Sequence, residues 1–336
     1  MSARAQLRTT STSEHSGSRL AEFIAQYGII LVLLVMVAAL SILSPLIRGE
    51  QFFLTSRNLL QVALQASINA IIAVGMTFVI TSGGIDLSVG SIVALAGICA
   101  AFAMKAGSGP WVGFLVAVMV GALCGLFNGL LVTRVNLPPF IATLGTMGIF
   151  RGTALVISDG RPIYGFGREF LEIFAGRIGS VPVPVIVAGL VAVIFWFVLT
   201  QTRLGKYTIA IGGSEETARL AGISIQAYKM KFYALGGFLT GIAAALLTAR
   251  LSAADPTAGT FFELDAIAAV VMGGTSLTGG EGSIGGTIVG ALIISLVRNG
   301  MNLFNVQSYW QQIVIGSVIV LAVMLDQWRK GQIHRE

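Results

Sequence analysis

The stretch TSGGIDLSVGS, residues 81–91, decides the fold of this chain. It is rich in Gly and Ser, carries the single carboxylate of Asp86, and separates two apolar runs. A similar break follows about 196 residues later, because residues 69–97 laid on residues 265–293 without a gap give 10 identities in 29 positions. Two interrupted apolar segments in corresponding places indicate a transport pathway. The alternative is that a chain rich in Ala, Gly, Ile and Val matches itself by composition.

The composition predicts an all-α, polytopic integral membrane protein. Of the 336 residues, 55% are hydrophobic and only 11% are charged, whereas a soluble domain carries about 25% charged residues. The 42 glycines suit helices that pack closely in lipid. The net charge of +6 does not indicate nucleic acid, because no basic stretch is interleaved with aromatics. Cys99 and Cys124 lie in apolar runs, which predicts buried thiols and neither a disulfide nor a metal site.

Ten apolar stretches predict ten transmembrane passes. An even number puts both termini on one side, and twelve Lys and Arg residues in the segments on that side against seven in the others predict a cytoplasmic location for both. The stretches 89–104 and 263–277 are short, so they either lie deep or belong to broken helices. Arg151 and Arg298 fall near the ends of passes, where their side chains are expected to snorkel. The ten stretches are 27–47, 59–80, 89–104, 111–133, 137–157, 183–200, 232–250, 263–277, 284–303 and 310–326.

This pattern divides the chain into three parts. Residues 1–26 are polar and predict a disordered cytoplasmic tail, residues 27–328 a single transmembrane domain, and residues 329–336 a second cytoplasmic tail. A cleaved signal peptide is the alternative for the N-terminus, but the run that begins at residue 27 is long enough to span and ends in no small-x-small site.

The longest inner loop, residues 201–231, contains a short helix with recognisable ends. Ser214 is placed to cap it, Glu215 and Glu216 favour the positive end of its dipole, and Gly222 can adopt the left-handed stop. Leu220 and Ile223 are expected on one side of this helix and the charges on the other. The helix is either a docking element or an ordinary solvated connector.

Together these segments resemble a known family, the membrane-spanning subunits of ATP-binding-cassette importers for monosaccharides of the ribose, arabinose, galactose and xylose type. The resemblance covers nearly the whole chain. It is carried by AVGMT at 73–77, GIDLSVGS at 84–91, FIATL at 140–144, LGKY at 204–207, GGSEETARLAGI at 212–223 and ELDAIAAVVMGGTSL at 263–277.

The resemblance implies partners and a location. ATP, with Mg²⁺, is expected to bind to a separate cytoplasmic ATPase subunit, a periplasmic binding protein is expected to deliver the sugar, and the permease is expected to pair with a second copy or a close paralogue in the bacterial inner membrane. The chain has no phosphate-binding P-loop of its own, so we expect no bound nucleotide, no catalytic residue and no metal on it. The coupling helix that would meet the ATPase comprises Ser214, Glu215, Glu216, Thr217, Arg219, Leu220 and Ile223.

The predicted translocation pathway follows the two breaks. Asp86 is an ionisable group in an apolar region, which is a functional hypothesis by default. The favoured alternative is structural, because Asp86 or Ser88 can cap the helix that follows; both roles can coexist. The pathway residues are Asn69, Thr81, Gly83, Gly84, Asp86, Ser88, Asp265, Gly279 and Gly280.

The outer loop, residues 158–182, mixes charges with aromatic side chains. Aromatic residues and Arg are enriched in the cores of protein interfaces, so Tyr164, Phe166, Arg168 and Phe170 are predicted to dock the periplasmic partner. An amphipathic turn lying on the membrane explains the same aromatics equally well.

The predicted function is therefore a subunit of an ATP-driven importer for a ribose-type pentose or hexose that works by alternating access. The competing hypothesis is a proton- or sodium-coupled secondary carrier of small solutes, for which only Asp86 and Asp265 offer titratable groups in the passes. A passive channel is disfavoured because it leaves the capped inner helix unexplained. The sequence does not identify the sugar.

Overall fold

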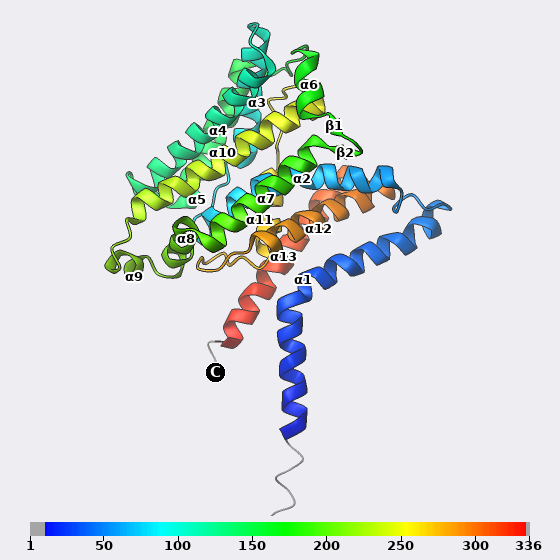
Figure 1. Ribbon diagram of the computed structural model, residues 1–336, viewed down its shortest axis with the longest axis vertical. Helices are drawn as coiled ribbons and strands as arrows, with labels where there is room; N and C mark the ends of the chain where they lie inside the picture. Colours follow the sequence, from blue (N-terminus) through cyan, green and yellow to red (C-terminus); the bar gives the residue numbers. More distant parts are fainter. Residues whose placement is uncertain (1–10, 334–336) are drawn as a thin grey trace, which may run out of the picture.

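The computed structural model describes residues 11–333, and this part of the chain is almost entirely helical (Figure 1). Its secondary structure is α1 (Ser11–Arg48), α2 (Ser56–Thr81), α3 (Val89–Lys105), α4 (Pro110–Thr133), α5 (Pro139–Ile157), α6 (Arg168–Phe174), β1 (Arg177–Ile178), β2 (Val181–Pro182), α7 (Val183–Gln201), α8 (Arg203–Gly213), α9 (Glu215–Leu220), α10 (Ile225–Leu251), α11 (Phe262–Met272), α12 (Ile284–Leu303) and α13 (Ser308–Ile333). The strands β1 and β2 form one small antiparallel hairpin.

Each of the ten predicted apolar stretches forms a helix, but not every one is a full pass. Seven helices in the described part are long and apolar enough to cross a membrane, judged by length and composition. A crossing needs about 20 residues, whereas α3 has 17 and α11 only 11. These are the two stretches for which the sequence predicts a deep position or a broken helix, and their short lengths agree with that prediction.

The centre of the fold is α10, which packs against α2, α3 and α4. Glycines bring these helices into backbone contact: a Cβ added to Gly75 of α2 would lie 2.9 Å from the Cα of Gly236. On the other side of α10, Gly121 and Gly125 of α4 meet Gly237 in the same way. Small residues permit this close approach in lipid, where helix association depends on packing.

The two ends of α10 mark the two ends of the molecule. Figure 1 shows α10 running from α8 and α9 at one end towards α6 and the β1–β2 hairpin at the other. We call these the α9 end and the α6 end. At the α6 end the outer loop is tied to the segment after α10, because Ile163 and Ala254 exchange two backbone hydrogen bonds of 2.9 and 3.0 Å. The predicted inner and outer loops thus lie at opposite ends.

The helices α3 and α11 begin at a common point inside the fold. A Cβ on Gly90, the second residue of α3, would overlap the carbonyl oxygen of Gly259 and the carboxylate of Glu263, the second residue of α11. From there α3 extends along α10, where Gly97 meets Thr248, towards the α6 end. In the opposite direction α11 leads to the loop that reaches the α9 end. Each helix therefore covers only part of the thickness of the protein.

The two breaks are related less simply than the ungapped alignment predicts. Helix α2 ends at Gly83 (φ +79°), and the next amide, that of Gly84, donates to Val79 O. Helix α11 ends in the same way at Gly274 (φ +86°), followed by a bond from Thr275 N to Val270 O. The structural counterpart of Gly83 is thus Gly274 and not Gly279. The starts of α3 and α12 do agree with the alignment to within one residue.

Most residues of the two predicted tails are helical. Helix α1 begins at Ser11, so residues 11–26 continue the first helix instead of forming a disordered tail, and α13 extends to Ile333. The remainder of the two predicted tails, residues 1–10 and 334–336, lies outside the described residues. Cys99 and Cys124 are free thiols, as predicted, but only Cys124 is fully buried.

Candidate functional site

The predicted inner helix exists as α9, and its ends are formed by the residues that the sequence singles out. The hydroxyl of Ser214 accepts a hydrogen bond from the amide of Thr217 at 3.2 Å, which is the capping geometry. At the other end Gly222 adopts a φ of +81°, and Ile223 N donates to Ala218 O at 3.0 Å. The short helix is therefore held at both ends by local bonds.

The faces of α9 differ from the prediction. Ala218 is buried and fixes the inward face, while Glu215, Glu216 and Arg219 are exposed. Leu220 is 81% exposed, whereas Ile223 is half-buried and packs on the main core. The two apolar side chains do not share one face, because Gly222 turns the chain between them. An exposed leucine remains beside the charged groups at the tip of the helix.

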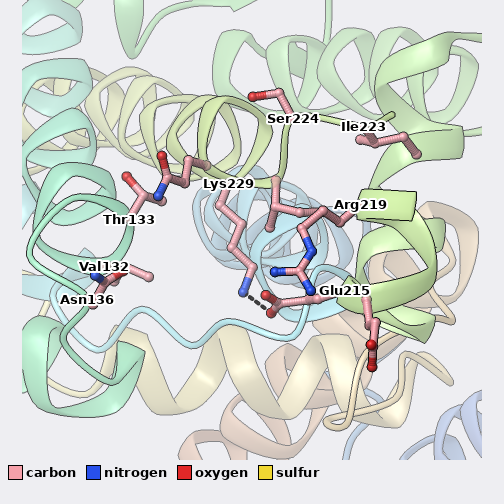
Figure 2. Close-up of a pocket in the computed structure, with 11 residues that line it drawn as sticks. Val132, Thr133, Asn136, Glu215, Arg219, Ile223, Ser224 and Lys229 are labelled. Atoms are coloured by element: carbon pink, nitrogen blue, oxygen red, sulfur yellow. Dashed lines mark hydrogen bonds and ion pairs between the residues drawn. The ribbon is translucent and has the colours of Figure 1, made fainter. Parts of the chain in front are cut away.

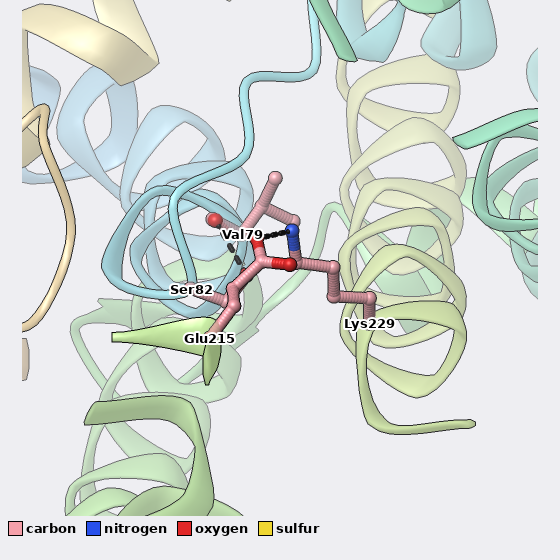
Figure 3. Close-up of polar contacts among 4 residues, drawn as sticks. All are labelled: Val79, Ser82, Glu215 and Lys229. Atoms are coloured by element: carbon pink, nitrogen blue, oxygen red, sulfur yellow. Dashed lines mark hydrogen bonds and ion pairs between the residues drawn. The ribbon is translucent and has the colours of Figure 1, made fainter. Parts of the chain in front are cut away.

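A hollow of about 710 Å³ lies beside α9, between this helix and the end of α4 (Figure 2). Lys229 of α10 extends across it and forms an ion pair with Glu215, which links α9 to α10 (Figures 2 and 3). Figure 3 also shows the nearby end of α2, where the hydroxyl of Ser82 donates to Val79 O at 2.8 Å. The residues that line the hollow are Val132, Thr133, Asn136, Glu215, Glu216, Arg219, Ile223, Ser224, Ile225, Gln226 and Lys229.

The end of α8 touches both glycine-rich breaks; Gly212 and Gly213 of α8, together with Ser214, form what we call the α8–α9 segment. A Cβ on Gly212 would overlap the carbonyl oxygen of Thr81 and the amide nitrogen of Gly280. These two atoms are themselves joined, because Gly280 N donates to Thr81 O at 2.9 Å. Gly279 packs on Gly83 as well, since a Cβ on Gly279 would lie 3.0 Å from the amide nitrogen of Gly83. The inner loop and the two breaks therefore touch one another at a single place, and the atoms in contact belong to the main chain.

Asp86 is fully engaged within the protein. Its Oδ1 accepts hydrogen bonds from the amide of Ser88 at 2.8 Å and from the Ser88 hydroxyl at 2.7 Å. Asn128 of α4 donates to both carboxylate oxygens at 3.3 Å and to Ser88 Oγ at 2.7 Å. Asp86 thus orders the turn that opens α3, while the Ser88 side chain makes no cap bond to the helix. This geometry supports the structural alternative for Asp86.

Two other predicted pathway residues, Asn69 and Asp265, border a second cavity. It has a volume of about 200 Å³ and lies between the middle of the fold and the α6 end. Arg298 of α12 donates from Nη2 to both oxygens of Asp265, at 2.8 and 2.6 Å, so its side chain pairs inside the fold and does not snorkel. The cavity is lined by Gln65, Ile68, Asn69, Leu247, Arg250, Phe262, Asp265, Ile294, Ser295, Arg298, Asn302 and Gln311.

Arg151 also pairs internally and does not snorkel. Its Nη1 donates to the carbonyl oxygens of Pro256 and Ala258, both at 2.7 Å. These carbonyls belong to the segment that leads from α10 to the start of α11. Arg151 therefore holds α11 in place from α5, a role that the sequence does not indicate.

The predicted docking surface in the outer loop is only partly exposed. Tyr164 is 61% exposed, and Arg168 is exposed and paired with Glu172 at 2.9 Å. Phe166 and Phe170 are buried, with Phe170 only 1% exposed. The ring of Phe166 meets that of Phe170 edge to face, and the ring of Phe170 meets that of Phe174 in a tilted arrangement. These two aromatics belong to the main hydrophobic core, and their prediction as docking residues is wrong.

The predicted site residues therefore fall into three places. The residues of α9 and its caps lie at the α9 end, in contact with the breaks at Thr81, Gly83, Gly279 and Gly280 through Gly212. Asp86 and Ser88 lie deeper, in a bonded network with Asn128. Asn69 and Asp265 line the second cavity, from which Asp86 is absent. No pattern in the sequence assigns Gln65, Arg250 and Arg298 to this cavity, although each is a polar residue in an otherwise apolar stretch.

The comparisons with known proteins agree with this architecture. Residues 58–323 match the family model described as branched-chain amino acid transport system / permease component. The chain is 42% identical over 316 residues to the D-allose transport system permease protein AlsC of Escherichia coli (strain K12), covering 94% of this chain and 95% of that protein. It is 47% identical over 302 residues to the ribose import permease protein RbsC of Bacillus subtilis (strain 168), covering 89% and 92%.

A third relative is more distant. The L-arabinose transport system permease protein AraH of Escherichia coli (strain K12) is 35% identical over 305 residues, covering 91% of each chain. No solved structure matches this chain.

Proposed function

This chain belongs to the family of branched-chain amino acid transport system / permease components, and from that premise we propose that it is the membrane-spanning subunit of an ATP-driven importer for a monosaccharide. The family is one of transport permease subunits, and the chain is a multi-pass membrane protein. The proposed solute class comes from relatives whose names specify D-allose, ribose and L-arabinose. A pentose or hexose is therefore the proposed cargo.

The observation that carries the proposal is the contact of the α8–α9 segment with both breaks. An ATPase that moves α9 would move Gly212, and Gly212 lies on Thr81 and Gly280. Because the contact consists of backbone atoms, a displacement cannot be absorbed by a side-chain rotation. The movement would pass into the end of α2 and into the loop between α11 and α12, and from there to the helices that follow the breaks.

Each proposed partner is assigned to one of the two ends of the fold. A cytoplasmic ATPase subunit, which binds ATP and Mg²⁺, would dock at the α9 end, with Leu220, Glu216 and Arg219 exposed to it. A periplasmic sugar-binding protein would dock at the α6 end, where Tyr164 and Arg168 are exposed. A second permease copy or close paralogue would complete the transporter in the bacterial inner membrane. On this proposal the chain itself holds no nucleotide.

The secondary-carrier alternative finds little support in the described residues. A coupled carrier needs a titratable group free to exchange an ion, yet Asp86 is bonded to Ser88 and Asn128. Asp265 is paired with Arg298 through two bonds. Both carboxylates are already engaged in the state described.

The test is purification of the tagged permease in mild detergent, together with the proteins expressed beside it. We expect an ATPase to co-purify, and we expect Glu215→Lys combined with Arg219→Glu to abolish that association and sugar uptake while the permease still elutes as a folded species. Uptake by vesicles that contain this chain alone, driven by a proton or sodium gradient, would contradict the proposal.

A further inference from the structure

The cavity at Asn69 contains polar atoms that the protein leaves unsatisfied. Asn69 is 7% exposed, and neither its Oδ1 nor its Nδ2 finds a hydrogen-bond partner among the described residues. The same holds for the buried Oε1 of Gln65, one helical turn earlier on α2, and for the Nε of Arg298 on α12. All three side chains line the cavity of about 200 Å³.

A buried polar atom without a hydrogen-bond partner lowers the stability of the folded protein. We therefore expect these four atoms to form hydrogen bonds with a molecule bound in the cavity. An amide nitrogen and a guanidinium N–H can only donate, whereas the two amide oxygens can only accept. The set therefore contains both kinds of partner. A hydroxyl group both donates and accepts, and a molecule with several hydroxyls can satisfy all four atoms at once. A fully deprotonated anion offers acceptors alone and would leave the Asn69 and Gln65 oxygens unpaired.

The charges around the cavity are compatible with an uncharged occupant. The carboxylate of Asp265 is neutralised by the two bonds from Arg298. Arg250 is the other charged residue of the lining and carries a positive charge, so an anion is the natural competitor and is tested below. The cavity lies between the middle of the fold and the α6 end, which is the end that a delivered solute would enter.

We propose that this cavity is a solute site of the permease, in which Asn69, Gln65 and the Nε of Arg298 bind the hydroxyl groups of an uncharged sugar. The inference rests on the proposed function, which supplies the solute class but no binding residue. Asn69 and Asp265 head the two segments that match in the sequence, and here they border one cavity from α2 and α11. A rearrangement at the break after α2 or after α11 would therefore move a helix that lines the cavity.

The first experiment separates solute binding from energy coupling. The complete transporter is reconstituted in liposomes with its ATPase and binding protein, and uptake of labelled D-ribose, D-allose and L-arabinose is measured beside ATP hydrolysis. We expect Asn69→Leu to lower uptake by about tenfold, the effect of losing one to two hydrogen bonds, while stimulated ATP hydrolysis stays within about twofold. The matched control is Ser67→Ala, a buried residue of α2 whose hydroxyl, among the described residues, bonds only to Leu64 O.

The results distinguish the two proposals. If the unchanged transporter imports none of the three sugars, the proposed function fails. If it imports one of them and Asn69→Leu behaves like Ser67→Ala, the cavity is not a solute site. Asn69→Ser, which keeps a donor and an acceptor, is measured in parallel, and partial uptake between the two is expected.

The second experiment measures occupancy directly and does not depend on the folding of an Asn69 variant. A single cysteine is placed at Ser295, a buried residue of the lining, in a chain that also carries Cys99→Ala and Cys124→Ala. We expect a saturating concentration of the imported sugar to slow labelling by a small thiol reagent. Protection by inorganic phosphate instead of sugar would show an anion site, and no protection by any solute in an active transporter would show a cavity that holds water; either result overturns the inference.

Discussion

Gly212 lies directly on the carbonyl oxygen of Thr81, so close that a single added methyl group would overlap it. This contact joins the segment before α9 to the end of α2, and the same glycine touches the amide of Gly280. The position tolerates no side chain, and its neighbour Gly213 has nothing within 4 Å of an added Cβ. Adjacent glycines thus have different roles, which allows the contact to be tested.

Gly212→Ala is expected to uncouple ATP hydrolysis from transport. The added Cβ forces the α8–α9 segment away from the two breaks, while the exposed surface of α9 is unchanged. We expect the ATPase still to associate and sugar uptake to fall by about tenfold or more, since overpacking costs about 1–3 kcal/mol. Gly213→Ala is the control and should transport normally. Equal uptake by the two variants would contradict a role for this contact.

Ser214→Ala is expected to weaken attachment of the ATPase. The hydroxyl of Ser214 is the side-chain cap of a helix of six residues, and loss of such a cap costs about 1 kcal/mol. Fraying of α9 should lower the affinity for the ATPase about fivefold, measured by titration of the detergent-purified complex. Ser224→Ala is the control, because Ser224 precedes α10 without making a side-chain cap bond. A loss of affinity in both variants would mean that capping is not the cause.

Asp86→Asn should fold and transport, whereas Asp86→Leu should lose folded protein. The asparagine keeps an oxygen that can accept from the Ser88 amide. The leucine leaves the buried amides of Ser88 and Asn128 without this partner, and each unsatisfied group costs about 1–3 kcal/mol. The measurement is the yield of monodisperse protein after gel filtration. Normal yield of Asp86→Leu with lost transport would assign Asp86 to the pathway instead.

Gly90→Ala is expected to destabilise the meeting point of α3 and α11. Its Cβ would overlap the backbone oxygen of Gly259, and backbone cannot turn aside as a flexible side chain can. We expect a lower melting temperature in detergent, consistent with about 1–3 kcal/mol of strain. Gly189→Ala on α7, where an added Cβ meets nothing within 4 Å, should melt as the unchanged protein does. A melting temperature for Gly90→Ala equal to that control would disprove the close contact.

Much of the fold follows from local signals in the sequence. Apolar runs set all ten predicted helices, and Ser214 and Gly222 mark the ends of α9 because capping depends on neighbours a few residues away. The end of α11 at Gly274 also depends on neighbouring residues. From the sequence alone, however, Gly273, Gly274, Gly279 and Gly280 are equally suited to end this helix. Only the packing of Gly279 and Gly280 on the α8–α9 segment assigns them another role.

The features that were missed depend on contacts between distant segments. Arg298 of α12 forms an ion pair with Asp265 of α11, and no sequence pattern near either residue indicates this pairing. Phe166 and Phe170 look like interface residues because a loop with exposed aromatics and a loop whose aromatics pack into the core have the same composition. Their burial under α6 is decided by the helices beneath, α4 and α10.

The contact at Gly212 has a consequence for how such proteins can diversify. The link that would carry the force of ATP hydrolysis is made of backbone atoms and glycines, whereas the cavity at Asn69 is lined by side chains. If the cavity holds the solute as proposed, substitutions in its lining would change the solute without altering the backbone contact at Gly212. The same backbone contact would then serve importers of different sugars, and these importers would differ in the few side chains that line the cavity.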